Sequence, residues 1–245
     1  MTKRPLLLPL VALTLAGCAA QDFNQGLNQV LGAMQQPGVA AALSDTDIVK
    51  GLREALAQGT TRAINQLGHT DGFWGDPAVR IPLPDNIARF EKTLRSFGQG
   101  AAVDEFHLTL NRAAEQAVPQ VADIFGNAVR QMTIDDARNI LGGSNDAATQ
   151  FFRRTQSDAL YARILPIVSN ATARVGVTQK YKAMISSYGP MLQLAGVKNT
   201  DLDAYVTGKA LDGLFSGIAG EEARIRENPA ARTSDILRRV FGAQH

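Results

Sequence analysis

Apolar residues recur at intervals of three and four along most of this chain, the spacing that places them on one face of an α-helix. The first such stripe starts after Ser44, where Ser44 and Asp47 form a capping-box pattern, and it ends at Gly68. Its apolar members are Ile48, Leu52, Leu56, Ala63, Ile64 and Leu67. No stretch of the sequence sustains the two-residue alternation of a β-strand. The pattern therefore predicts an all-α fold.

The later stripes predict a single compact multi-helix domain over 43–245, with roughly nine helices joined by short turns. After the first, the expected helices begin near Asp85, Ala101, Val121, Thr133, Asp146, Tyr181, Asp201 and Thr233. The one near residue 181 depends on Tyr181, Met184, Ile185 and Tyr188. Pro166 lies inside the stripe that follows Asp146. It is expected to kink or divide that helix, because proline removes a main-chain donor.

One long segment, 69–84, does not follow the helical period. It holds the only tryptophan, Trp74, and three of the ten prolines. Aromatic and apolar residues in a loop indicate that the loop is buried, so we expect an ordered loop that packs into the helix assembly. Asp71, Asp76 and Arg80 are expected to fix its turns. A role as the rim of a binding site is the second interpretation.

The first residues predict an export signal and not a part of the fold. An apolar run, Leu6 to Leu15, follows two basic residues and is too short to span a bilayer. The sequence Leu15-Ala16-Gly17-Cys18 resembles the lipobox of a bacterial lipoprotein, and Cys18 is the only cysteine. We expect a signal peptide over 1–17, cleavage before Cys18, and acyl chains such as palmitate on that residue. The alternative is an ordinary secretory signal or membrane anchor with a chance cysteine.

Residues 18–42 are predicted to be the lipidated cysteine and a flexible tether, because Gln, Asn, Gly and Ala dominate the segment. Two or three acyl chains anchor a protein stably, since each buried methylene contributes about 0.8 kcal/mol. Ala19 follows the cysteine where an aspartate would favour the inner membrane. The expected location is therefore the outer membrane of a Gram-negative cell, facing the periplasm.

Charge argues against nucleic acid as a partner. The chain has 25 Lys and Arg against 23 Asp and Glu, and loss of Lys3 and Arg4 with the signal equalises the two. Nucleic-acid binding requires a concentrated basic surface, which a neutral mature chain does not indicate. With its only thiol lipidated, the chain can form neither a disulfide nor a cysteine metal site.

The sequence contains no Walker A motif, dinucleotide fingerprint, His-Glu-x-x-His or Gly-x-Ser-x-Gly. His69 and His107 are far apart in the sequence, so both are interpreted as structural histidines. Neither a metal nor a cofactor is predicted. Asp71 and Asp76, with two nearby glycines, offer possible Ca²⁺ ligands. They lack the spacing and the distal glutamate of an EF-hand loop, and turn-forming Asp-Gly and Asp-Pro pairs explain them equally well.

Other polar residues are candidates for a binding or structural cluster. The turn before Asp146 leads into a helix whose N-terminus could bind an anion, with Arg153 or Arg154 close by. The simpler interpretation is that Asp146 itself occupies the helix dipole. The full set of candidates is Asp71, Trp74, Asp76, Arg80, Asp146, Arg153, Arg154, Lys209, Asp212, Glu222 and Arg232.

Two further candidates involve ion pairs. Lys209 and Asp212 are three residues apart in an apolar helix. A buried lysine beside carboxylates can act as a general base, although a structural ion pair is the commoner arrangement. Arg80 stands between two apolar residues in the loop and is expected to have an acidic partner. The acidic residues considered for it are Glu115, Asp212, Glu221 and Glu222.

Several segments together resemble an uncharacterised bacterial family, domain of unknown function 4197. The matching segments are 71–84 (DGFWGDPAVRIPLP), 111–119 (NRAAEQAVP), 146–149 (DAAT), 152–155 (FRRT), 205–207 with 209–215 (YVT, KALDGLF) and 228–233 (NPAART). They cover about residues 44 to 242. The resemblance implies an exported, helical and often lipid-anchored protein. It implies no established activity and no catalytic residue.

These observations favour a non-enzymatic protein that binds an envelope partner or an apolar ligand between helices. The alternative is an envelope hydrolase-type enzyme that uses Asp71 or Asp76, Arg80, and the group of Lys209, Asp212 and Glu222. That enzyme requires the polar residues of the motifs to meet in one cleft. If they are instead dispersed as helix caps and ion pairs, their role is structural.

Overall fold

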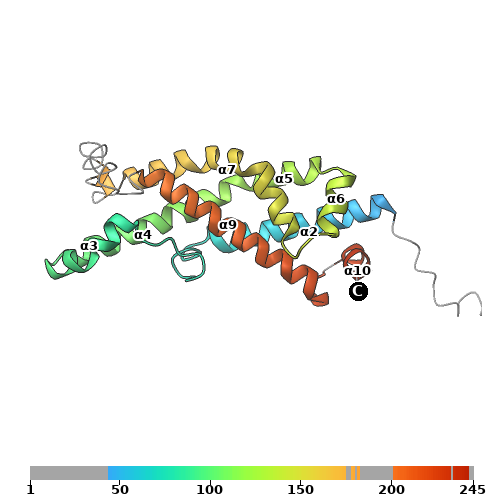
Figure 1. Cartoon of the computed structure of the whole chain (residues 1–245), viewed down its shortest axis with the longest axis horizontal. Helices are drawn as coiled ribbons and strands as arrows, with labels where there is room; N and C mark the ends of the chain where they lie inside the picture. Colours follow the sequence, from blue (N-terminus) through green and yellow to red (C-terminus); the bar gives the residue numbers. More distant parts are fainter. Residues whose placement is uncertain (1–43, 175–177, 180, 183–200, 233, 243–245) are drawn as a thin grey trace, which may run out of the picture. The chain divides into compact units, whose positions relative to one another are not determined.

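The computed structural model describes residues 44–174, 178–179, 181–182, 201–232 and 234–242. All regular structure among them is helical, in agreement with the predicted all-α class, and none of the described helices is long and apolar enough to cross a membrane (Figure 1). The predicted signal, Cys18 and the tether lie outside the described residues. The helices are α2 (Asp45–Gly68), α3 (Asp85–Ser96), α4 (Gly100–Ala117), α5 (Ala122–Gln131), α6 (Ile134–Leu141), α7 (Ala147–Ala173), α9 (Leu202–Glu227) and α10 (Asp235–Gly242), with short 3₁₀ turns at Val118–Val121 and Pro229–Ala231.

Two helix starts agree with the capping residues in the sequence. At α2, the Ser44 hydroxyl accepts the Asp47 N–H at 3.1 Å, and the Asp47 carboxylate accepts the Ser44 N–H at 3.3 Å. Thr133 and Asp136 form the same reciprocal pair at the start of α6. Each box satisfies amides that have no partner within the helix, which is why these two boundaries could be predicted from local sequence.

The described residues hold fewer α-helices than the nine predicted. The helix expected around Tyr181 lies mostly outside them, including Met184, Ile185 and Tyr188. Pro166 does not divide its helix, because α7 continues past it to Ala173. The carbonyl of Ala162 loses its helical donor at that proline, but both residues are exposed and water can reach the group.

The core forms where α9 packs against α2 on one side and α7 on the other, and α4 packs against α7. Phe125, Phe152 and Phe215 are among the largest side chains that are fully buried in it. The segment 69–84 forms a series of turns between α2 and α3, as predicted (Figure 1). Phe73 inserts from these turns into the core and is completely buried.

A glycine in α9 makes room for that phenylalanine. A Cβ atom built on Gly213 would lie 2.6 Å from Cε1 of Phe73 and 3.5 Å from Cβ of Val79. No such neighbour surrounds Gly208 of the same helix, where a Cβ would meet nothing within 4 Å. Gly213 is therefore the point at which the loop and the helix backbone come into close contact.

We expect Gly213→Ala to be less stable than Gly208→Ala by about 1–3 kcal/mol, the usual cost of overpacking a filled core. Both variants gain the same helix propensity, so the difference between them isolates the contact with Phe73. Urea denaturation followed by circular dichroism measures it. Equal stabilities for the two variants would contradict the close approach.

Candidate functional site

The loop 69–84 is held by a buried carboxylate of α4. Glu115 is 4% exposed, and its Oε1 accepts the main-chain N–H of Phe73 at 3.0 Å and of Trp74 at 3.1 Å. Buried amides outside regular structure need such a partner, because leaving them unpaired is costly. Glu115 therefore supplies the hydrogen bonds that irregular backbone cannot make with itself.

Arg112 compensates the charge of that carboxylate and extends the contact to the start of the loop. It donates to Glu115 Oε2 at 2.6 Å and to Asp71 Oδ1 at 2.7 Å. The hydrogen bond to Glu115, followed by the one to Asp71, raises the pKa of the Arg112 guanidinium above its ordinary value. Asp71 has a φ of 68°, the left-handed conformation that aspartate tolerates better than most residues.

Further along the loop, Asn111 pairs with the backbone of Ile81 as a neighbouring strand would. Its Oδ1 accepts the Ile81 N–H at 2.8 Å, and its Nδ2 donates to the Ile81 carbonyl at 3.0 Å. A ring nitrogen of His107 lies 2.8 Å from the same carbonyl. His107, Asn111 and Glu115 are spaced four residues apart, so one face of α4 carries every one of these contacts.

Among the described residues, Arg80 does not have the acidic partner predicted for it. Its Nε donates to the Trp74 carbonyl at 2.6 Å, and its guanidinium carbon lies 4.9 Å from the centre of the Trp74 ring. The same ring meets His107 edge-on, with the ring centroids 4.9 Å apart. Glu115, one of the acidic residues considered for it, binds Arg112 instead. An aromatic face and a carbonyl together satisfy an arginine without a carboxylate.

The remaining loop contact agrees with the predicted role of Asp76. Its Oδ1 accepts the Ala78 N–H at 2.9 Å, the bond of an aspartate that fixes a turn.

Just past the turns, the Tyr205 hydroxyl of α9 donates to the Pro82 carbonyl at 3.0 Å. Burial, followed by the charge of Asp85, raises the pKa of Tyr205 to about 12, so the donating proton is retained at neutral pH.

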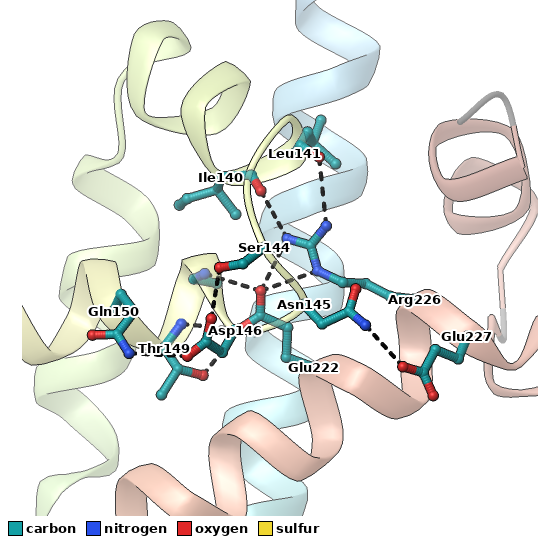
Figure 2. A network of polar contacts seen from close by, with 11 residues as sticks. Ile140, Leu141, Ser144, Asn145, Asp146, Thr149, Gln150, Glu222, Arg226 and Glu227 are labelled. Atoms are coloured by element: carbon teal, nitrogen blue, oxygen red, sulfur yellow. Dashed lines mark hydrogen bonds and ion pairs between the residues drawn. The ribbon is translucent and has the colours of Figure 1, made fainter. Parts of the chain in front are cut away.

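A second buried glutamate serves a different part of the chain. Glu222 of α9 accepts the N–H of Ala148 on Oε1, and the N–H and hydroxyl of Thr149 on Oε2, each at 2.9 Å. These amides belong to the first turn of α7, where the helix dipole favours a negative charge. Figure 2 shows the carboxylate lying against the start of that helix. Glu222 thus caps α7 from a position more than seventy residues away in sequence.

Arg226 completes this arrangement one turn further along α9. Its Nη2 donates to Glu222 Oε1 at 2.9 Å and to the Ile140 carbonyl at 2.7 Å, at the end of α6 (Figure 2). One ion pair therefore joins three helices, with an anion at the start of α7 and a cation at the end of α6. Both positions match the sign of the helix dipole.

Asp146 is the N-cap residue of α7, but its side chain forms no capping hydrogen bond with the first turn of the helix. It accepts hydrogen bonds from Ser144 at 2.6 Å and Gln150 at 2.9 Å, and the first of these lowers its pKa below the ordinary value. The main-chain amides of that turn bind Glu222 instead. Arg232 caps the C-terminal end of α9, where it donates to the Ile225 carbonyl at 3.2 Å and to the Arg226 carbonyl at 2.7 Å.

The other predicted cations lie on the surface. Arg153 approaches Asp212 at 3.6 Å, and its guanidinium carbon lies 4.5 Å from the centre of the Phe215 ring. Lys209 pairs with the same Asp212 at 3.7 Å. Arg154 makes no ion pair within the described part of the chain. Lys209 and Asp212 are both well exposed, so they form a solvated pair of the kind that contributes little to stability.

The predicted polar residues therefore form separate networks. Asp71 belongs to the Glu115 network, Asp212 to a surface pair, and Glu222 to the helix caps. No hydrogen bond or ion pair among the described residues links loop carboxylates or Arg80 to Lys209, Asp212 or Glu222. Nor do the described residues contain a cluster of three potential metal ligands. The cleft that the hydrolase interpretation requires does not follow from these contacts.

An open groove of about 500 Å³ lies between α4 and α7. The α7 wall consists of Ile167, Asn170, Ala171 and Arg174. The α4 wall consists of Glu105, Leu108, Thr109, Arg112, Ala113 and Gln116. A second, smaller cavity of about 20 Å³ lies beneath Glu222 and has room for about one water molecule. Only the first is large enough for an organic ligand, for which about 300–1,000 Å³ is typical.

Sequence reasoning missed the residues that bind the loop from α4. Asn111, Arg112 and Glu115 lie in the resembling segments but were not predicted as site residues. The available signal was the polar series His107, Asn111 and Glu115, which recurs at four-residue spacing beside the apolar face of that helix. Such a series indicates a buried polar face with a main-chain partner.

Fold and contacts together define an all-helical protein whose motif side chains bind main-chain groups of a long loop and of helix ends. The chain belongs to the family described as protein of unknown function (DUF4197), which matches residues 42–242. This confirms the resemblance seen in the sequence. No curated protein and no solved structure shows significant similarity to the chain.

We expect Glu115→Ala to lower the free energy of unfolding by about 3–5 kcal/mol, because it removes the acceptor of two loop amides and the buried partner of Arg112. Glu115→Gln keeps an acceptor oxygen and should cost less. Glu105→Ala, an exposed glutamate on the same helix, is the matched control and should change stability by about 0.5 kcal/mol or less. Urea denaturation followed by Trp74 fluorescence measures all three. A Glu115→Ala variant as stable as the control would contradict the anchoring role.

Proposed function

We propose that this protein is a non-catalytic lipoprotein, anchored in the outer membrane of a Gram-negative cell and facing the periplasm. In this proposal its helical domain binds an apolar ligand or an envelope partner between helices. The observation that carries the binding part is the groove between α4 and α7, a space of suitable size beside the motif residues.

Anchoring is supported by the N-terminal sequence. Two basic residues, a short apolar run and Leu15-Ala16-Gly17-Cys18 have the order of a lipoprotein signal. Ala19 follows the cysteine, which favours the outer membrane. The segment between Cys18 and Ser44 is long enough to act as a tether between the lipid and the first described helix.

A binding role is favoured over catalysis by how the polar residues are used. Glu115 and Glu222, the two buried carboxylates, each accept two consecutive main-chain amides and pair with an arginine. A carboxylate bound in this way is not free to take a proton from a substrate, because its oxygens already accept hydrogen bonds from the protein. The groove, in contrast, carries several polar side chains that have no such commitment.

We expect Cys18→Ala to abolish incorporation of radiolabelled palmitate and to release the protein from the membrane fraction. Ala19→Asp is the matched change, since it keeps the acylated cysteine and alters only the sorting residue. It should retain the label and move the protein from outer to inner membrane in a density gradient. Label on Cys18→Ala, or an unlabelled wild-type chain, would contradict the proposed anchoring.

A further inference from the structure

The two walls of the α4–α7 groove run in opposite directions. Arg163 of α7 donates to the Gln120 carbonyl at 3.0 Å and approaches Asp123 at 3.3 Å, just beyond the end of α4. From this contact, α7 runs on toward Arg174 at its C-terminal end. The N-terminal end of α4, which carries Glu105, lies in the same direction because the two helices are antiparallel. Glu105 and Arg174, the outermost lining residues on each wall, therefore lie at the same end of the groove.

The groove is long, and part of its lining is apolar. From Glu105 to Gln116 the α4 wall rises about 16 Å, at 1.5 Å per helical residue. Ile167 and Ala171 contribute partly buried apolar surface that is continuous with the core, and Leu108 faces them from α4. This apolar part suits a hydrocarbon chain, whose burial there would be favourable in proportion to the apolar area covered.

Of the three charged side chains that line the groove, only Arg112 forms ion pairs with described residues. Arg112 lines the middle of it but already binds both Glu115 and Asp71. At the end of the groove, Glu105 and Arg174 are exposed and form no ion pair, with each other or with any other described residue. One carboxylate and one guanidinium without an ion-pair partner among the described residues thus lie at the same end of a partly apolar groove.

We infer that the groove binds an amphiphile with a zwitterionic headgroup. The anionic group of the ligand meets Arg174, its cationic group meets Glu105, and its hydrocarbon chain lies along Leu108, Ile167 and Ala171. A purely anionic or cationic headgroup would meet one favourable and one repulsive charge, so the pair selects a zwitterion. This inference rests on the groove of the proposed function and specifies its ligand class.

Isothermal titration calorimetry of the full chain with four probes below their micelle concentrations tests the inference. Dodecylphosphocholine carries both charges, while dodecyl phosphate and dodecyltrimethylammonium carry one each on the same hydrocarbon chain. Dodecyl maltoside carries none. We expect dodecylphosphocholine to bind at least tenfold more tightly than the other three. Free phosphocholine, which lacks the chain, should show no binding, since otherwise the headgroup alone would explain the affinity.

Charge variants identify the contacts. Arg174→Glu and Glu105→Lys should each remove the tenfold preference, and the double exchange should restore most of it, because one charge of each sign returns. Arg154→Glu and Asp158→Lys change exposed charges of α7 outside the groove and should leave the preference intact. A preference that survives both single groove variants would overturn the inference.

Groove-filling variants separate this inference from the proposed function. Ala171→Trp and Thr109→Trp each fill the groove from a different wall, so a folding defect in one leaves the other usable. One outcome is that all probes bind the wild type with equal affinity and none binds the two tryptophan variants. In that case the groove is the binding site, but the preference for a zwitterion is wrong. If filled and open grooves bind the probes alike, both proposals fail.

Discussion

Two buried glutamates, Glu115 and Glu222, make the same interaction at two places in the fold. Each accepts a pair of consecutive main-chain amides and pairs with an arginine on its own helix, Arg112 or Arg226. The underlying constraint is that buried N–H groups outside a helical ladder need an acceptor. A carboxylate oxygen can meet two at once, and the arginine compensates the charge that this places in the interior.

This constraint explains why most motif residues lie where they do. The first motif is a loop that buries Phe73 against Gly213 of α9, and the second supplies Asn111, Arg112 and Glu115, which bind that loop. Further motifs contribute the capped start of α7 and Arg232 at the end of α9. Removing Glu115 would leave the Phe73 and Trp74 amides without their acceptor, and removing Glu222 would do the same to the amides of Ala148 and Thr149, so each network depends on its carboxylate.

Local features of the fold could be predicted from sequence, and features that depend on distant partners could not. The helical stripes, the capping boxes at Ser44 and Thr133 and the long loop all follow from residues close together in the chain. The cap of α7 comes instead from Glu222, and no local pattern distinguishes it from Asp146 as the acceptor. Arg80 was assigned an acidic partner because arginine often has one, yet the Trp74 ring and carbonyl satisfy it in the fold.

Arg112 connects the structural network to the groove. Its guanidinium holds Asp71 at the start of the loop while its side chain forms part of the α4 wall. A ligand in the groove therefore lies beside the residue that fixes the loop, and it meets a cation whose hydrogen bonds are already directed elsewhere. Specific recognition must then come from the uncommitted side chains at the end of the groove. The loop 69–84 is accordingly a structural element bound to one wall of the groove through Arg112, which reconciles its burial with its place next to the candidate binding site.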